Sequence, residues 1–405
     1  MADDSDSEEI LTIENSDVVT KYKIAADISN RTMKKLITSC VNGARILDLC
    51  VLGDKEIEDG VKPFYIKNKV PKGVAFPTCI SVNNVICHFS PLSSDPEASN
   101  TLKPGDLVKI QLGAHIDGYA AITATTLVIG ASNENPVKGV QADVITAAHY
   151  ASEAALRLIK PGLNNMTVTQ TIQKISQIYG TNSVEGMLSH QQEKNEIEGK
   201  KQIILNPSDA QKRDFESTNF AENEVWGVDI LISSGDGKPK PSNVRTTVYR
   251  KTGETYLLKM KTAREVLSEI TNKFGTFPFP LRALSDERKA RLGIVECSKH
   301  GLVVPYNVFQ EKEEEYVAQV FFTVLLTKNG PLKITNTYFD PSVIQSDKKI
   351  EDEQVLQILS SPLRKNKKKK KSGKGGAEKA EKKPADNEPA EKKPAEKEQA
   401  EKIVE

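Results

Sequence analysis

Residues 102–130 read LKPGDLVKIQLGAHIDGYAAITATTLVIG, and this stretch decides the fold class. Apolar residues alternate along residues 106–116, and a second apolar-rich run follows directly after Asp117-Gly118. An Asp-Gly pair between two such runs is typical of a two-residue β-hairpin turn. Pairing about this turn places Gln111 opposite residue 124, so Gln111 and Ile122 become diagonal neighbours on one face of the predicted hairpin.

Two helix pairs flank the hairpin in the sequence. Apolar residues recur at helical spacing over about residues 16–53, with Ser16 as a good N-cap, and again over residues 144–179. The two regions match at a constant offset of 122 residues, which aligns Ala25-Ala26 with Ala147-Ala148. This match indicates an internal duplication, and hence a folded body with two similar halves.

Further strands are predicted from the apolar runs of the remaining sequence. Residues 74–89 read as a hairpin around Asn83-Asn84, and residues 224–234 and 316–327 read as single strands. Residues 259–300 are charged and have a helical pattern. The order is helices followed by antiparallel strands, twice, with a helical insertion, and this order is typical of an α+β fold.

The composition excludes several classes of protein. No apolar run in the 405 residues approaches the ~18 residues of a membrane span, and the start MADDSDSEE is the reverse of a basic, apolar signal peptide. Five cysteines without paired spacing suit a reducing compartment and argue against a disulfide framework or a structural zinc site. We therefore expect a soluble intracellular protein.

The charge distribution is more informative than the net charge of +1. The first seventeen residues hold seven acids and no base, whereas residues 364–374 hold eight bases and no acid. Residues 1–15 lack periodicity, and residues 361–405 are rich in lysine with few apolar side chains, so both ends are predicted to be disordered. The predicted folded body is residues 16–360.

Several motifs carry a family resemblance that spans about residues 17–340. They are the quoted hairpin, FPTCISVNNVICHFSP, GMLSHQ, VWGVDILISSG, NKFGTFPFPLRAL and YVAQVFFTVLL. Their order resembles that of the type-2 methionine aminopeptidases. This resemblance implies the pita-bread fold, in which two pseudosymmetric halves surround a dinuclear metal site. Within that superfamily the chain is most similar to the proliferation-associated proteins, also described as ErbB-receptor-binding or curved-DNA-binding proteins.

The resemblance also implies where metal ligands would lie. The family holds two divalent ions with two Asp, one His and two Glu, and the matching positions of this chain hold Gln111, Ile122, His190, Asp229 and Phe321. An amide and two apolar side chains cannot supply the negative charge that offsets two cations. We therefore predict no catalytic residue, no metal and no cofactor.

His88 matches the substrate-contacting His of the family, so His88, His190 and Asp229 remain from the site. One interpretation is a mononuclear metal site. The other, which we favour, is that these residues are hydrogen-bonded and line a leftover cavity. A working metalloaminopeptidase with a changed ligand set stays as an alternative to a non-enzymatic protein.

Two basic segments are candidates for binding nucleic acid. The dense run near the end of the chain consists of Arg364, Lys365, Lys367, Lys368, Lys369, Lys370, Lys371 and Lys374. Such a run can neutralise phosphates or act as a nuclear-import signal, and its plain alternative is a solubilising tail. A second cluster, Lys259, Lys261 and Arg264, is linked to RNA by the resemblance, whereas the residues alone fit a solvated helix face equally well.

The resulting prediction is a non-enzymatic RNA- and ribosome-binding scaffold of ribosome biogenesis, translation or growth regulation. The resemblance implies ribosomal or other structured RNA and the large ribosomal subunit as partners, with DNA and regulatory proteins as further candidates and no membrane. It implies the cytoplasm and the nucleus, including the nucleolus, as locations. A DNA-binding transcriptional regulator is the alternative from another class.

Overall fold

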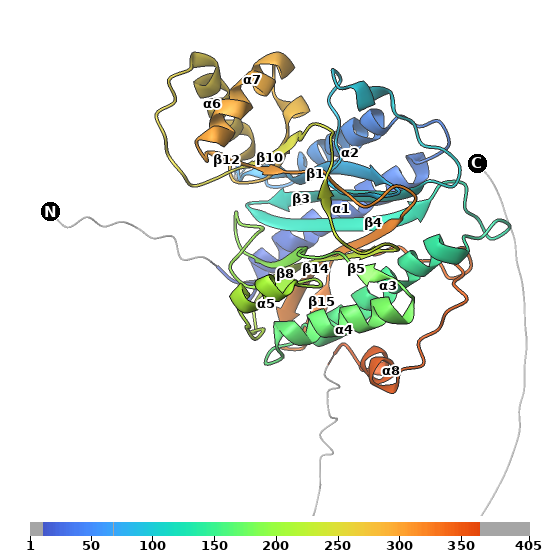
Figure 1. Ribbon diagram of the computed structural model, residues 1–405. Helices are drawn as coiled ribbons and strands as arrows, with labels where there is room; N and C mark the ends of the chain where they lie inside the picture. The colour runs from blue at the N-terminus through green and yellow to red at the C-terminus, as the bar shows by residue number, and fades with distance from the viewer. Residues whose placement is uncertain (1–10, 68, 365–405) are drawn as a thin grey trace, which may run out of the picture. The chain divides into compact units, whose positions relative to one another are not determined.

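The computed structural model describes residues 11–67 and 69–364. Its centre is a nine-stranded antiparallel sheet in which the order is β1-β3-β4-β14-β8-β6-β7, with β15 paired to β14 and β5 paired to β8 (Figure 1). The strands are β1 (Lys72–Val82), β3 (Leu107–Ile116), β4 (Tyr119–Val128), β5 (Asn182–Ser183), β6 (Leu188–Gln192), β7 (Gln202–Ile204), β8 (Val225–Ser233), β14 (Val317–Thr327) and β15 (Gly330–Lys333). The predicted α+β class is confirmed.

The hairpin of β3 and β4 has the predicted register. Ile116 pairs with Tyr119 across the turn, and Gln111 pairs with Ala124. Both turn residues have positive φ, 54° at Asp117 and 81° at Gly118. This is the backbone that a type I′ turn requires, and it explains why an Asp-Gly pair stands here.

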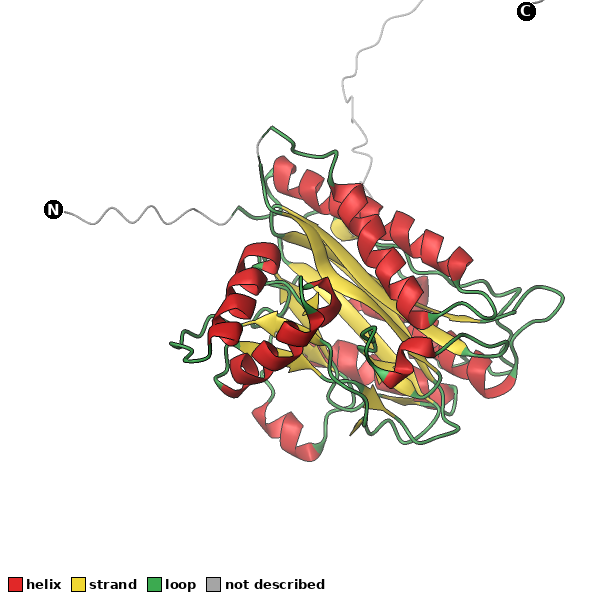
Figure 2. Cartoon of the chain, turned by 90° about the horizontal axis from the view of Figure 1, so that it is seen from above, coloured by secondary structure: helices red, strands yellow, loops and turns green. Residues whose placement is uncertain are grey.

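Four helices cover one face of the sheet. They are α1 (Ser16–Ser39), α2 (Ile46–Val61), α3 (Gly139–Leu158) and α4 (Asn165–Ile178). The first pair packs on β1, β3 and β4, and α3 packs on β8 and β14, so each helix pair covers one half of the sheet. Figure 2 shows helices lying along the strands of the large sheet. The N-cap of α1 is Asn15 and not Ser16, because the Asn15 side chain accepts the hydrogen bond from the Asp17 N–H.

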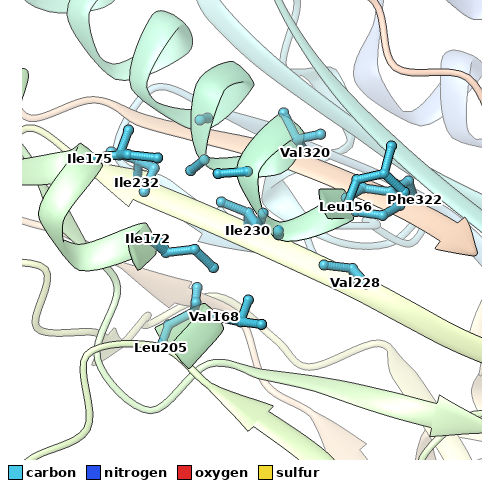
Figure 3. Close-up of a cluster of buried hydrophobic side chains, with 14 of the residues drawn as sticks. Leu156, Val168, Ile172, Ile175, Leu205, Val228, Ile230, Ile232, Val320 and Phe322 are labelled. Atoms are coloured by element: carbon cyan, nitrogen blue, oxygen red, sulfur yellow. The ribbon is translucent and has the colours of Figure 1, made fainter. Parts of the chain in front are cut away.

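The two halves have separate apolar cores on this helix-covered face. One core joins α3 and α4 to β8 and β14 (Figure 3), and its residues include Leu156, Val168, Ile172, Ile175, Val228, Ile230, Ile232, Val320 and Phe322. The other core joins α1 and α2 to β3 through residues such as Leu36, Ile57, Ile110 and Leu112. Because strand side chains alternate between faces, the neighbours of these residues point to the opposite, helix-free face.

The predicted helical insertion consists of two helices and a small sheet beyond one side of the large sheet (Figure 1). Its elements are β10 (Val248–Lys251), α6 (Lys261–Phe274), β11 (Phe279–Pro280), α7 (Glu287–Lys299) and β12 (Val303–Tyr306). Arg282, between the two helices, forms an ion pair with Asp54 of α2 and donates to Ser90 Oγ. This buried arginine ties the insertion to the body.

One predicted hairpin differs from the structure. The chain reverses at Asn83-Asn84 as predicted, but β2 (Val85–Cys87) pairs with β13 (Phe309–Gln310) and not with β1; β13 also pairs with β9 (Lys240–Pro241). The Asn83 amide explains this, since it donates to Asp106 and accepts from the Leu107 N–H, which holds the turn against the start of β3.

The ordered body also begins before residue 16, because Ile13 is buried beside Val18 and Tyr22. The remaining helices of the described residues are α5 (Asp209–Asp214), α8 (Glu353–Ser360) and the short 3-10 helices η1 (Pro96–Ser99) and η2 (Leu281–Ala283). Among the described residues, no helix combines the length and the apolar character that crossing a bilayer requires. Of the basic run at 364–374, Arg364 is described and exposed, and the remaining lysines lie outside the described residues.

Candidate functional site

The five positions that the resemblance matches to metal ligands lie together on the helix-free face of the large sheet. Phe321 pairs directly with Asp229 on one side and with Ala124 on the other. Gln111 also pairs with Ala124, and His190 pairs with Gly227, two residues before Asp229. The structure therefore brings all five strands of the predicted site side by side, and the predicted diagonal relation of Gln111 and Ile122 holds.

Asp229 is partnered by an amide. Its side chain is 5% exposed, and Oδ1 accepts a hydrogen bond of 2.9 Å from Nε2 of Gln319 on β14. The same Nε2 lies 3.5 Å from Oε1 of Gln111. Burial raises the pKa of Asp229 to about 7, although the Gln319 hydrogen bond opposes this rise. One carboxyl group beside two amides lacks the charge that a divalent ion needs.

Apolar side chains fill the rest of this face. Ile122 and Phe321 belong to a buried cluster that also includes Ile197. A Cβ on Gly227 would lie 2.8 Å from Cζ of Phe321, so the phenyl ring covers that strand position closely. Ile197 comes from the loop after β6, while the insertion adds Val248 and Phe277 to the same cluster. The loop after β6 and the insertion therefore cover this face with apolar side chains.

A polar group borders this apolar cluster. Glu198 accepts hydrogen bonds from the Tyr306 hydroxyl and, at 2.8 Å, from Nη2 of Arg250. The His88 ring lies 5.2 Å from the Tyr306 ring, and burial lowers the pKa of His88 to about 4, so the imidazole is neutral near pH 7. Burial also lowers the pKa of His190, whose Nδ1 lies 3.5 Å from the Gly199 carbonyl oxygen.

This donor set does not fit a metal site. Within residues 11–67 and 69–364, no group of three or more His, Cys, Asp or Glu side chains is placed to hold an ion. His190 and Asp229 lie on the neighbouring strands β6 and β8, whereas His88 lies against the rings of Phe76 and Tyr306, so each has a separate environment. We derive no metal-dependent step for this protein, and the interpretation with a mononuclear metal finds no support in the geometry.

The second basic cluster lies at the start of the insertion. Lys259 and Lys261 are exposed, and Lys261 Nζ is 3.8 Å from Glu265 within α6. Arg264 is also exposed, but its Nη1 donates to the carbonyl oxygens of Leu258 and Lys259. Lys259 and Lys261 are therefore accessible to phosphates, with Lys261 also facing Glu265, whereas Arg264 is largely engaged in holding the preceding loop.

Sequence reasoning missed Gln319, Ile197 and the group around Glu198. Gln319 precedes Phe321 by two residues, so the period of a strand could have placed both side chains on one face. No local pattern marks Ile197 or Glu198, because their partners are on distant strands of the insertion.

Comparison with known proteins agrees with this fold. A family profile described as metallopeptidase family M24 matches residues 20–233. The protein belongs to the metallopeptidase family M24, and it has the pita-bread fold. The resemblance of its motifs to the proliferation-associated, ErbB-receptor-binding and curved-DNA-binding proteins is confirmed by relatives with these names.

The chain is 47% identical to the curved DNA-binding protein of Schizosaccharomyces pombe over 364 residues, which cover 90% of this chain and 95% of that protein. It is 43% identical to ERBB-3 binding protein 1 of Solanum tuberosum over 394 residues, which cover 95% and 99% of the two chains. A solved structure of a thermophilic Arx1 is 38% identical and superimposes with a TM-score of 0.82, covering 87% of this chain and all of that one.

Proposed function

We propose that this protein is a non-enzymatic scaffold that binds RNA and ribosomes and acts in ribosome biogenesis, translation or growth regulation. The observation that carries the proposal is the pairing of Phe321 with Asp229 on the face where the family holds its metal ions. Hydrolysis in this family needs a metal-activated water and a base. Here the carboxyl group is buried against an amide and an apolar cluster, so the chain supplies neither.

The binding role is supported by charge and by relatives. Lys259 and Lys261 are exposed cations on the insertion, and the basic run at 364–374 adds a dense positive segment. One relative is named for binding curved DNA, which supports contact with a nucleic acid. Lysine ammonium groups attract phosphates without reading base edges, so this binding should tolerate changes of sequence and weaken steeply with salt.

Sedimentation with purified large ribosomal subunits over a salt series tests this proposal. The variants are a chain that ends at Leu363, the double variant Lys259→Glu/Lys261→Glu and the control Lys34→Glu/Lys55→Glu, which makes the same charge change on exposed helix positions of the body. The truncation should reduce the steepness of the fall of log K with log salt by roughly 3–6. The Lys259→Glu/Lys261→Glu variant should weaken binding, and the control should match the natural chain. Binding that is unaffected by the truncation would contradict the role of the basic run.

Assays of peptide hydrolysis test the non-enzymatic part separately. The natural chain should not release methionine from a Met-Ala peptide with Mn²⁺, Co²⁺ or Zn²⁺. Metal-dependent turnover that disappears in an Asp229→Ala variant would restore the alternative of an active aminopeptidase.

A DNA-binding regulator is a second candidate, favoured by the name of the relative from Schizosaccharomyces pombe. Competition between bent duplex DNA and ribosomal RNA distinguishes the two, because a preference for the duplex at equal salt would favour DNA. The scaffold role also implies the cytoplasm and the nucleus, including the nucleolus. Loss of nuclear signal from a fluorescent fusion without residues 364–405 would assign import to the basic run.

A further inference from the structure

Helix α7 has two apolar faces, and the described residues cover only one of them. Its inner face packs on α6 so closely that a Cβ on Gly293 would lie 2.7 Å from Cγ2 of Val266. On its outer face, Leu292 is 64% exposed and Val295 is 66% exposed. These two aliphatic side chains lie one helical turn apart, so they are neighbours on the helix surface and form a small exposed apolar patch.

The two charged residues that continue the line of this pair along the helix are both cations. Arg288 and Lys299 continue the line of Leu292 and Val295 along the helix at spacings of four, three and four residues, and all four are exposed. Within the described residues, neither Arg288 nor Lys299 forms an ion pair, whereas Lys289 lies 3.6 Å from Glu265. We call Arg288, Leu292, Val295 and Lys299 the outer stripe of α7.

The acidic residues of α7 are occupied by other partners. Glu287 accepts hydrogen bonds from the hydroxyl groups of Ser93 and Ser94 in the body. Glu296 lies 3.1 Å from Nε2 of His300. The outer stripe therefore presents two aliphatic side chains between two cations without an acid of its own to neutralise them.

We propose that the outer stripe of α7 binds an acidic amphipathic helix of a partner protein. Spacings of four, three and four residues are those of the seam of a two-helix coiled coil, so a helix laid along the stripe can bury two apolar side chains on Leu292 and Val295. Its acidic residues then meet Arg288 and Lys299 at the two ends, which sets its position along α7.

The same charges disfavour two other occupants. In a dimer of this chain through α7, an antiparallel arrangement places Arg288 against Lys299 of the other copy, and a parallel one places each cation against its own counterpart, so both bring like charges together. RNA phosphates would suit the two cations, but they offer no apolar surface to the aliphatic pair at the centre of the stripe. An acidic amphipathic helix offers carboxylates to the two cations and apolar side chains to Leu292 and Val295.

The experiment measures fluorescence anisotropy of two synthetic helical peptides added to the full-length protein. Both peptides carry leucines at positions i and i+3, and their flanking residues are glutamates in one peptide and lysines in the other. The protein variants are Leu292→Gln/Val295→Gln and the control Val51→Gln. Val51 is a matched aliphatic residue, 48% exposed on α2.

The acidic peptide should bind the natural chain at least about tenfold more tightly than the basic peptide, and the double variant should weaken it by about tenfold or more. The control variant should leave its affinity unchanged. Equal affinity of the two peptides, or unchanged affinity in the double variant, would overturn the proposal. Two further results would overturn it. One is that the natural chain forms dimers in sedimentation equilibrium and the double variant does not. The other is that duplex RNA competes with the acidic peptide and that RNA binding itself requires Leu292 and Val295.

Discussion

Phe321 of β14 lies directly opposite Asp229 of β8, so an aromatic ring and a carboxyl group share one face of the sheet as cross-strand neighbours. Such pairs have Cβ atoms about 4.5–5.5 Å apart. In this position a second carboxylate would complete a charged cluster, whereas a phenyl ring excludes water from the one that remains. The Phe321 ring therefore adds to the burial that raises the pKa of Asp229.

The first prediction concerns Asp229. Its pKa of about 7 in the folded protein exceeds the ordinary value of 3.8, so the folded state loses stability as pH rises from about 4 to about 7. Asp229→Asn can keep the acceptor for Gln319 and removes this titration. The variant should match the natural chain at pH 4 and exceed its unfolding free energy by roughly 1–3 kcal/mol at pH 8.

Urea denaturation from pH 4 to pH 8 measures this difference, and the exposed Asp347→Asn serves as the control. A variant that is less stable than the natural chain at pH 8 would show that the charged carboxylate is needed, as a metal ligand would be.

The second prediction concerns Ile197, which the loop after β6 places in the apolar cluster with Ile122 and Phe321. Ile197→Ala removes buried methyl groups and leaves a cavity, so it should lower the unfolding free energy by roughly 2–4 kcal/mol. Ile66 is 68% exposed, and Ile66→Ala should change stability by less than about 0.5 kcal/mol. Equal effects of the two substitutions in thermal or urea unfolding would mean that the loop does not close the site.

The third prediction concerns the ion pair of Arg282 and Asp54, whose side chains are 9% and 15% exposed. Asp54→Asn leaves a buried guanidinium without its carboxylate, which should destabilise the attachment of the insertion by roughly 3–5 kcal/mol. Hydrogen exchange should therefore accelerate in α6 and α7 more than in β3.

The exposed pair of Lys62 and Asp59 provides the control, and Asp59→Asn should have little effect on exchange. The double variant Asp54→Asn/Arg282→Met should recover part of the loss, because it removes the unpaired charge. Uniform exchange throughout the body of the Asp54→Asn variant would argue against a local tether.

The fourth prediction concerns Gly53 in α2. A Cβ at this position would lie 2.4 Å from Oγ1 of Thr78 on β1 and 2.9 Å from Cδ1 of Leu36 on α1. Gly53→Ala should therefore separate the helix from the sheet and lower stability by roughly 1–3 kcal/mol, despite the better helix propensity of alanine. Gly253 has no atom within 4 Å of an added Cβ, so Gly253→Ala should be neutral in the same denaturation experiment.

Local sequence was sufficient for the elements of the fold and for part of the site. The Asp117-Gly118 turn sets the register of β3 and β4, because only a two-residue turn with positive φ joins the strands there. That register alone places Gln111 and Ile122 on one face. The pairing of β2 could not be predicted in the same way, because Asn83 joins the turn to Asp106 and Leu107, which are more than twenty residues away.

The sequence by itself determined the helix pairs and the principal hairpin, since each depends on residue type and on neighbours a few positions away; that three metal-ligand positions are replaced stays a prediction from the family resemblance. Only the tertiary structure decided that Gln319 bonds Asp229, that Ile197 closes the cluster and that Glu198 joins Arg250 and Tyr306. Tyr306 and Glu198 are 108 residues apart. Contacts of this kind depend on how the insertion packs on the sheet. The strand and helix periodicities of two and 3.6 residues do not predict that packing.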